Sequence, residues 1–170
     1  MPDNQEILQD MTKPEQEGQQ VANFGQVIFE ILEQAEKPDE EALPYLFQDM
    51  AEVNMSAESE VLRTQTLTDP MLLGHFEQLL GPGKVFIATL VGRQRVAPNK
   101  RPDEPKKLVQ MSMALFRFKE QEADFLVSVN TELEDPSNSA TADQITDFFN
   151  EVVANVKLPS REAFLALFPS

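Results

Sequence analysis

Two segments rich in β-forming residues lie close together in the middle of this chain. They span 108–119 (LVQMSMALFRFK) and 123–131 (ADFLVSVNT), and three residues, 120–122 (EQE), join them. A parallel pair of strands needs a crossover of about a dozen residues, so these segments must pair antiparallel as a hairpin. A third such segment, 84–97 (KVFIATLVGRQRVA), precedes them across a loop with three prolines. The sequence therefore predicts a mostly antiparallel sheet at the centre of the fold.

Apolar residues recur at helical spacing in two other segments. The first is 39–53, in which Pro44 disturbs the opening turns. Its apolar face consists of Leu43, Leu46, Phe47, Met50 and Val53. The second starts at Thr141, where Gln144 three residues later gives the spacing of a capping box. Its apolar face consists of Ile145, Phe148, Phe149, Val152, Val153 and Val156, and each helix is predicted to bury its apolar face on the core.

Shorter elements complete the expected fold. Two strands and one short helix are predicted at 26–33, 60–68 and 69–80. The apolar residues of the tail are expected to pack on the core: Phe164, Leu165, Leu167 and Phe168. Residues 9–23 are polar, contain a proline and a glycine, and are interpreted as a mobile connector. Paired strands without a regular strand–helix alternation predict the α+β class, in a single domain over 1–170.

The chain is strongly acidic, and its acidic residues are concentrated in the first third. The net charge is −15 at pH 7. Residues 1–60 hold fifteen acidic side chains against two lysines, and residues 61–170 hold fourteen against twelve basic ones. This distribution argues against nucleic acid and anionic membranes as partners, and it favours a partner with a basic face. The alternative is a solubilising surface that has no partner.

The sequence lacks the marks of a membrane or secreted protein. No uninterrupted apolar stretch approaches the roughly 20 residues that a membrane-spanning helix needs. The first ten residues carry three acidic side chains and no basic ones, the opposite of a leader peptide. The chain has no cysteine, which excludes disulfides, zinc–thiolate sites and cysteine nucleophiles. We expect a soluble, intracellular protein.

Few residues have a pattern typical of an active site. His75 is the only histidine, which excludes a metal site or proton relay built on several histidines, and we interpret it as a packed or exposed helix residue. The sequence GPGK at 81–84 lacks the spacing and the hydroxyl of a phosphate loop, so we interpret it as a helix end and a turn. A carboxylate-dependent hydrolase is a further alternative, but no positioned partner for the carboxylates is evident. We therefore expect no enzyme activity, no cofactor and no metal.

Basic side chains gather on both sides of the proline-containing loop: Arg93, Arg95, Lys100, Arg101, Lys106 and Lys107. They could contact an acidic partner or nucleic acid. No aromatic residue lies between Gly92 and Leu108, so a platform on which bases stack is missing. The favoured interpretation is a solvated hairpin tip.

Four motifs occur in a characteristic order along the chain. Residues 1–7 (MPDNQEI) match the pattern V-P-D-x-Q-E-V, and 26–33 (QVIFEILE) match a strand of the type S-I-I-x-x-L-L-E. Residues 45–54 (YLFQDMAEVN) match a helix that ends in aromatic-H-[FV]-E-D-L-x-E-x-N. Residues 114–118 (ALFRF) and 123–130 (ADFLVSVN) match the strand pair A-L-x-R-[LF] and T-D-x-[VL]-[IL]-[ST]-[IV]-N. Taken in this order, the motifs resemble those of the Ran guanine-nucleotide release factor family, the Mog family.

The sequence departs from the family pattern in two places. Leu46 and Gln48 stand where the family has His and Glu, so contacts made by those polar residues are not expected here. The family also has a first strand with a pair of glycines before the motif at 1–7, and this sequence lacks it. We expect a shortened form of the family's domain.

The resemblance implies an α/β/α sandwich with a mostly antiparallel central sheet flanked by helices, similar to the PsbP extrinsic proteins. It also implies binding to the GTPase Ran and promotion of guanine-nucleotide release, which supports nuclear protein import. The residues implied to bind Ran are Asp3, Asn4, Gln5 and Glu6, with Asp49 and Glu52 as supporting acidic residues. We expect a monomer located in the nucleus and cytoplasm. The alternative function is a PsbP-like, non-catalytic scaffold or adaptor that does not act on Ran.

Overall fold

The computed structural model describes residues 25–56, 58–97, 105–133, 141–158 and 160–168. Within these residues, five strands form one sheet in the order β1-β5-β4-β3-β2, and every neighbouring pair is antiparallel. The strands are β1 (Gln26–Glu33), β2 (Ser59–Thr66), β3 (Val85–Val96), β4 (Lys107–Phe118) and β5 (Ala123–Glu132). The helices are α2 (Asp39–Val53), α3 (Pro70–Leu80), α4 (Ala142–Ala154) and α5 (Arg161–Leu165). The predicted α+β class with an antiparallel sheet is confirmed.

The hairpin formed by β4 and β5 is the centre of this sheet. Phe118 pairs with Ala123 next to the turn, and Val109 pairs with Glu132 at the far end. Glu122 closes the turn with a φ of 50°, a left-handed conformation that single residues adopt in tight turns. Most residues of the two strands are buried, because helices cover both faces of the sheet at this point.

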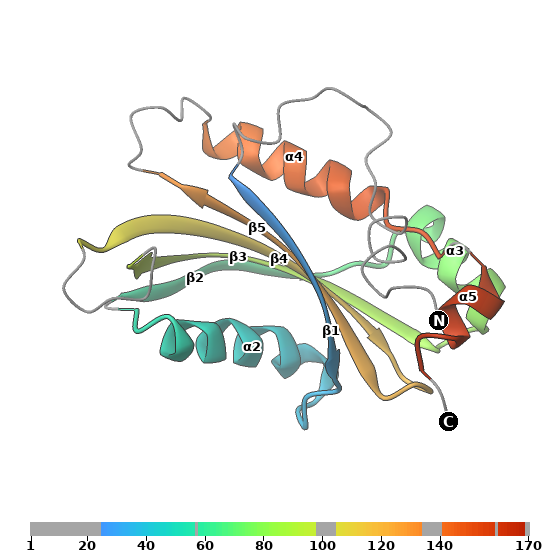
Figure 1. Ribbon diagram of the computed structural model, residues 1–170. Helices are drawn as coiled ribbons and strands as arrows, with labels where there is room; N and C mark the ends of the chain where they lie inside the picture. Colours follow the sequence, from blue (N-terminus) through green and yellow to red (C-terminus); the bar gives the residue numbers. More distant parts are fainter. Residues whose placement is uncertain (1–24, 57, 98–104, 134–140, 159, 169–170) are drawn as a thin grey trace.

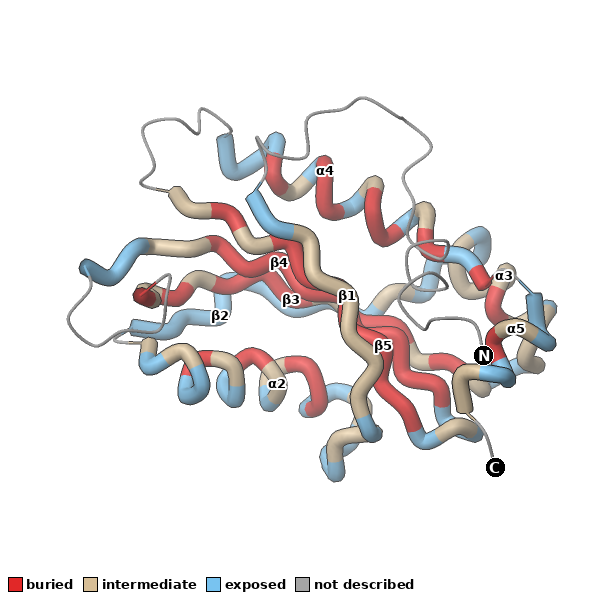
Figure 2. The backbone as a smooth tube through the Cα atoms, in the orientation of Figure 1, coloured by how far each residue is buried: buried red, intermediate tan, exposed pale blue. Residues whose placement is uncertain are grey.

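The helices lie on opposite faces of the sheet, which makes the fold an α/β/α sandwich (Figure 1). On one face, α2 packs on an apolar cluster from the three central strands: Ala88, Leu90, Met111, Met113, Leu115 and Leu126. On the other face, α3, α4 and α5 cover a larger cluster that includes Val85, Ile87, Phe116, Phe125 and Val127. Figure 2 shows the buried residues concentrated in β3, β4 and β5 and along the inner sides of α2 and α4. The layered arrangement that the resemblance implied is therefore present.

Helix α4 forms as its sequence predicts. The Thr141 hydroxyl accepts from the Gln144 backbone N–H at 3.2 Å, and the Gln144 side chain accepts from the Thr141 N–H at 2.9 Å. This reciprocal pair satisfies two of the donors that a helix start leaves free. All six residues of the predicted apolar face are buried: Ile145, Phe148, Phe149, Val152, Val153 and Val156.

Helix α2 has the predicted bounds and keeps Pro44 in its interior. Phe47 is the centre of its buried face, and its ring lies directly against Gly92 of β3. A Cβ atom added at Gly92 would lie 2.6 Å from the Phe47 ring and 2.8 Å from the Glu60 carbonyl oxygen. The helix can therefore approach the sheet this closely because residue 92 has no side chain. The prediction that Val53 belongs to the buried face is wrong: it is the last helical residue, and its side chain is 59% exposed.

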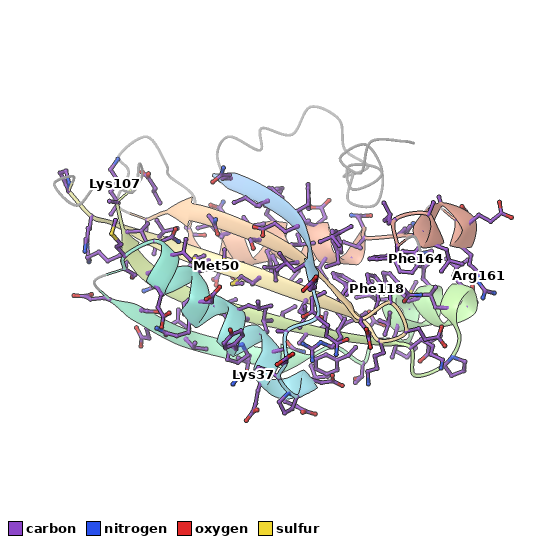
Figure 3. The ribbon with its side chains drawn as sticks, turned by 60° about the horizontal axis from the view of Figure 1, so that its bottom comes forward. Lys37, Met50, Lys107, Phe118, Arg161 and Phe164 are labelled. Atoms are coloured by element: carbon purple, nitrogen blue, oxygen red, sulfur yellow. The ribbon has the colours of Figure 1, made fainter. Side chains whose placement is uncertain are left out.

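The tail docks on the core, as predicted, although its short helix α5 was not expected. Phe164 is buried, with its ring centroid 4.7 Å from that of Phe118 and 5.2 Å from that of Phe168. Figure 3 shows Phe118 and Phe164 beside each other at this end of the sheet. Leu165 is a correction to the prediction, because it points outward and is 40% exposed. The predicted connector at 9–23 lies outside the described residues.

Candidate interaction surface

The residues predicted to bind a partner fall into two groups. Asp3, Asn4, Gln5 and Glu6 lie outside the described residues. Asp49 and Glu52 lie on the last turns of α2, and both are exposed. Their exposure follows from the helical repeat, since Phe47, Met50 and Ala51 occupy the side that faces the sheet.

Four carboxylates on α2 form what we call the acidic α2 surface: Glu40, Glu41, Asp49 and Glu52. All four are exposed, and within the described part of the chain none of them is in an ion pair. Two acidic residues beside this surface differ, because Asp39 is bonded to Arg117 and Lys119, and Glu58 lies 3.7 Å from Arg95. Among the described residues, no basic side chain neutralises these four carboxylates, so their negative charge lies at the surface.

A groove of about 230 Å³ runs along the side of α2 that faces β2. Its apolar wall is made by Leu43, Pro44 and Phe86, and Thr64 and Thr66 line it from β2. Glu40 lies at the rim, so the groove adjoins the acidic α2 surface. The groove lies between α2 and β2, the outermost strand of the sheet, whose residues are all exposed.

A buried arginine fixes the start of α2. Arg117, on β4, is 1% exposed, and it lies directly opposite the fully buried Asp124 of β5. Its Nε donates to Asp124 Oδ1 at 2.9 Å and its Nη2 donates to Asp124 Oδ2 at 3.1 Å, a bidentate pair. The remaining donors reach the chain before α2: Nη2 bonds the Ala35 carbonyl at 3.1 Å, and Nη1 bonds the Lys37 carbonyl at 2.7 Å and Asp39 Oδ1 at 3.3 Å. All five N–H groups of the guanidinium thus have an acceptor.

The arginine and its carboxylate form one structural unit, which we call the Arg117 cluster. The hydrogen bond to Asp124 raises the pKa of Arg117, while burial opposes that effect. Asp124 Oδ2 also accepts from the Ala35 N–H at 3.1 Å. Arg117 and Asp124 together therefore bond both the backbone N–H and the backbone carbonyl of Ala35. Because Arg117 and Asp124 both belong to the strand motifs quoted above, these motif positions maintain the fold. The sequence contains a signal for this ion pair. Arg117 and Asp124 are opposite charges in otherwise apolar strands, and the hairpin turn places them directly opposite each other.

His75 has a structural role on the other side of the molecule. Its Nε2 accepts a hydrogen bond of 2.8 Å from the Leu158 N–H, and its ring lies edge-on to Phe76 with centroids 5.2 Å apart. Burial lowers the pKa of His75, and the charge of Lys157 lowers it further. The neutral imidazole therefore joins α3 to the segment after α4, in agreement with the prediction of a packed helix residue.

Of the four described basic side chains between residues 93 and 107, three have a partner within the chain, whereas the Nε of Arg93 is buried without a hydrogen-bond partner. Lys106 Nζ bonds the Met55 carbonyl at 3.1 Å, Lys107 Nζ lies 3.5 Å from Glu132, and Arg95 lies near Glu58. Lys100 and Arg101 lie outside the described residues. Among the described residues, no group of three His, Cys, Asp or Glu side chains could hold a metal ion, and no helix is long and apolar enough to cross a membrane.

The sequence of the chain matches a protein-family model described as "Ran-interacting Mog1 protein" over residues 1–132. The chain belongs to this family. The match to the Mog1 family contains the motif at 1–7, the acidic α2 surface and the Arg117 cluster, and it ends at the last residue of β5. No curated protein sequence matches the chain closely enough to be taken as a relative.

Two solved structures with this family name are similar to the chain. One is a mutant of the protein Mog1, with 20% sequence identity, a TM-score of 0.45, and coverage of 90% of this chain and 68% of the other. The second is the Ran-binding protein Mog1p of Saccharomyces cerevisiae, with 19% identity, a TM-score of 0.43, and coverage of 90% and 69%.

Proposed function

We propose that this protein binds the GTPase Ran and promotes release of its guanine nucleotide. The observation that carries the proposal is the Mog1 family match over residues 1–132, which includes Asp3, Asn4, Gln5 and Glu6. These residues are proposed to make the main contact, and Asp49 and Glu52 are proposed to support it.

The proposed mechanism is competition between an acidic surface and the bound nucleotide. A GTPase holds the phosphates of its nucleotide with a lysine, backbone N–H groups and Mg²⁺. Carboxylates placed near that site attract the same cationic groups and stabilise the empty GTPase. Binding shifts the equilibrium by the difference between its affinities for the empty and the loaded forms. No nucleophile or general base takes part, so the protein acts without covalent catalysis and without a cofactor.

The described residues support this mechanism through charge and rigidity. Asp49 and Glu52 are exposed and have no ion pair within the described residues, so a basic partner displaces no internal bond when it approaches. The Arg117 cluster holds the start of α2 through four hydrogen bonds, three from Arg117 and one to Asp124. A helix fixed in this way loses little freedom on binding, which favours affinity. The activity is proposed to support nuclear protein import by a monomer present in the nucleus and cytoplasm.

The test is a titration of nucleotide-free Ran, with release of a fluorescent guanine nucleotide followed in parallel. We expect Asp3→Ala with Glu6→Ala to weaken binding by about 2–5 kcal/mol, the usual effect of removing charged contacts from an interface. Asp49→Asn with Glu52→Gln should weaken it less. A matched control is Asp143→Asn with Asp147→Asn, which removes two exposed charges from α4 on the opposite face of the sheet. Wild-type protein that neither binds nucleotide-free Ran nor accelerates release would contradict the proposal.

A further inference from the structure

The two edges of the sheet differ in how far they are covered. β1 forms one edge, and most of its residues are half-buried. β2 forms the other edge, and all eight of its residues are exposed (Figure 2). Within the described part of the chain, β2 is paired with β3 on one side and has no strand on the other. An uncovered edge presents N–H and C=O groups that can pair with another chain.

The free backbone groups of β2 can be assigned to particular residues. Just after β2, the Leu67 N–H donates to the Ile87 carbonyl at 2.9 Å, so residue 67 points toward β3. Backbone groups alternate in direction along an antiparallel strand. Gln65, paired with Thr89, therefore also points toward β3, and Thr64 and Thr66 point their N–H and C=O groups outward. An added strand needs at least two residues in a regular stretch whose backbone N–H and C=O groups point outward, and Thr64 and Thr66 are two such residues.

The same two threonines line the groove beside α2. Their side chains share the groove with the apolar surface of Leu43, Pro44 and Phe86, and Glu40 lies at its rim. A volume of about 230 Å³ has room for one long side chain. Backbone pairing and a side-chain pocket are the two components of recognition by strand addition.

We propose that the edge of β2 binds an extended, basic segment of a partner protein as an additional strand. The segment pairs with Thr64 and Thr66, and one lysine or arginine side chain enters the groove. Its aliphatic part lies over Pro44 and Phe86, and its cationic group lies against Glu40. This binding site goes beyond the proposed action on Ran and does not depend on it.

Charge selects the chemistry of the partner. Glu40 and Glu41 lie on the acidic α2 surface next to the groove, and the chain carries a net charge of −15. A second copy of the chain would bring the same acidic surfaces together and be repelled, whereas a basic segment would be attracted. The register shift between Val61 and Arg63 limits the regular edge to its second half. Such a bulge discourages pairing with long strands, so the site suits a short segment.

The experiment uses the full chain and synthetic peptides with blocked ends. The probe alternates lysine and threonine over eight residues, the first control has glutamate in place of lysine, and the second is the lysine peptide with N-methyl groups along one edge. We expect the lysine peptide to slow hydrogen exchange at the Thr64 and Thr66 amides at least about tenfold. Neither control peptide should have this effect. The N-methyl peptide keeps the charge, so it separates backbone pairing from simple attraction to an acidic protein.

Two variants locate the site, with a third as control. Thr64→Pro removes an outward N–H, and prolines are tolerated on edge strands in this position. Glu40→Gln removes the charge at the rim of the groove. Each should weaken binding of the lysine peptide about tenfold, and Thr64→Val, which keeps the backbone N–H, should not. The proposal is overturned by equal binding of either control peptide, by protection elsewhere than β2, or by protection of β2 in a dimer formed without peptide.

Discussion

Helices α2 and α4 lie on opposite faces of one sheet and are held there in different ways. α4 has a capping box in its own sequence, and its whole apolar face is buried. α2 begins after Pro38, which provides no side-chain cap, and it contains Pro44. α2 has no side-chain cap of its own. Instead, the Arg117 cluster forms hydrogen bonds to the residues immediately before the helix. The helix that carries the acidic α2 surface is thus the one whose position depends on distant residues.

The residues that hold α2 in place are therefore different from the acidic residues that it exposes. In α4, the capping box and the apolar spacing of its own sequence agree with the way the helix packs. In α2, the ring of Phe47 packs on Gly92. Met50, labelled on α2 in Figure 3, also packs on the apolar cluster under the helix. The outer side of α2 is acidic, and within the described part of the chain its four carboxylates have no ion pair. Three substitutions test this comparison.

The largest expected effect comes from Arg117→Met. The variant leaves the carboxylate of Asp124 buried without its partner, and it removes the donors to Ala35 and Lys37. Breaking a buried pair in this way costs about 3–5 kcal/mol. The free energy of unfolding, from denaturant titration, should fall by that amount. In native-state hydrogen exchange, the amides of α2 should lose more protection than those of α4.

The control for this prediction is Arg117→Met combined with Asp124→Leu. Replacing both charges by apolar side chains is often close to neutral, so the double variant should recover much of the stability. It should not recover the protection of the first turn of α2, because the bonds to Ala35 and Lys37 remain absent. Equal protection of α2 in the wild type and the double variant would contradict the role given to the Arg117 cluster.

A smaller effect is expected from Thr141→Ala at the start of α4. The variant loses the hydroxyl that accepts from the Gln144 N–H, and loss of such a cap costs about 1 kcal/mol. Thr141→Ser keeps the acceptor and serves as the control. Thermal melts should show a modest decrease for the alanine variant, with α2 unaffected. A loss of stability as large as that of Arg117→Met would contradict the small, local effect expected of this cap.

The smallest effect concerns His75 and pH. Burial lowers its pKa in the folded protein, so as the pH falls the unfolded chain takes up the proton first. The contribution of His75 to stability is therefore complete above about pH 6.5 and is lost as the pH falls through the lower, folded-state pKa. The unfolding free energy of wild type and His75→Gln, measured across this interval, should converge toward acid pH. If the difference in unfolding free energy between the two proteins does not change with pH, protonation of the His75 imidazole does not affect stability.

The sequence predicted the elements whose signals are local. The hairpin of β4 and β5 follows from a three-residue turn, and α4 follows from its cap and apolar spacing. The exposure of Asp49 and Glu52 also follows from the helical repeat of α2. The tail was less accurately predicted, because the outward direction of Leu165 depends on a short helix that lacks a long apolar pattern.

What sequence reasoning missed arises from contacts between distant segments. The acceptors of Arg117 at Ala35, Lys37 and Asp39 lie about eighty residues before it, and no local pattern connects them. The groove exists because the sheet order places β2 outside β3, at the edge of the sheet beside α2. Hydrophobic patterning identifies strands, but it does not by itself determine which of them becomes an edge.

The pairing of β1 with β5 has a consequence for synthesis of the protein. Glu33 pairs with Ala123 and Gln26 with Asn130, so the first described strand finds its partner late in the chain. At roughly 5–20 residues per second, the ribosome needs several seconds to complete β5 after β1 has been made. During that interval Val27, Phe29 and Ile31 have no sheet to cover them. We expect the emerging chain to need a chaperone at this strand until the hairpin of β4 and β5 has left the ribosome.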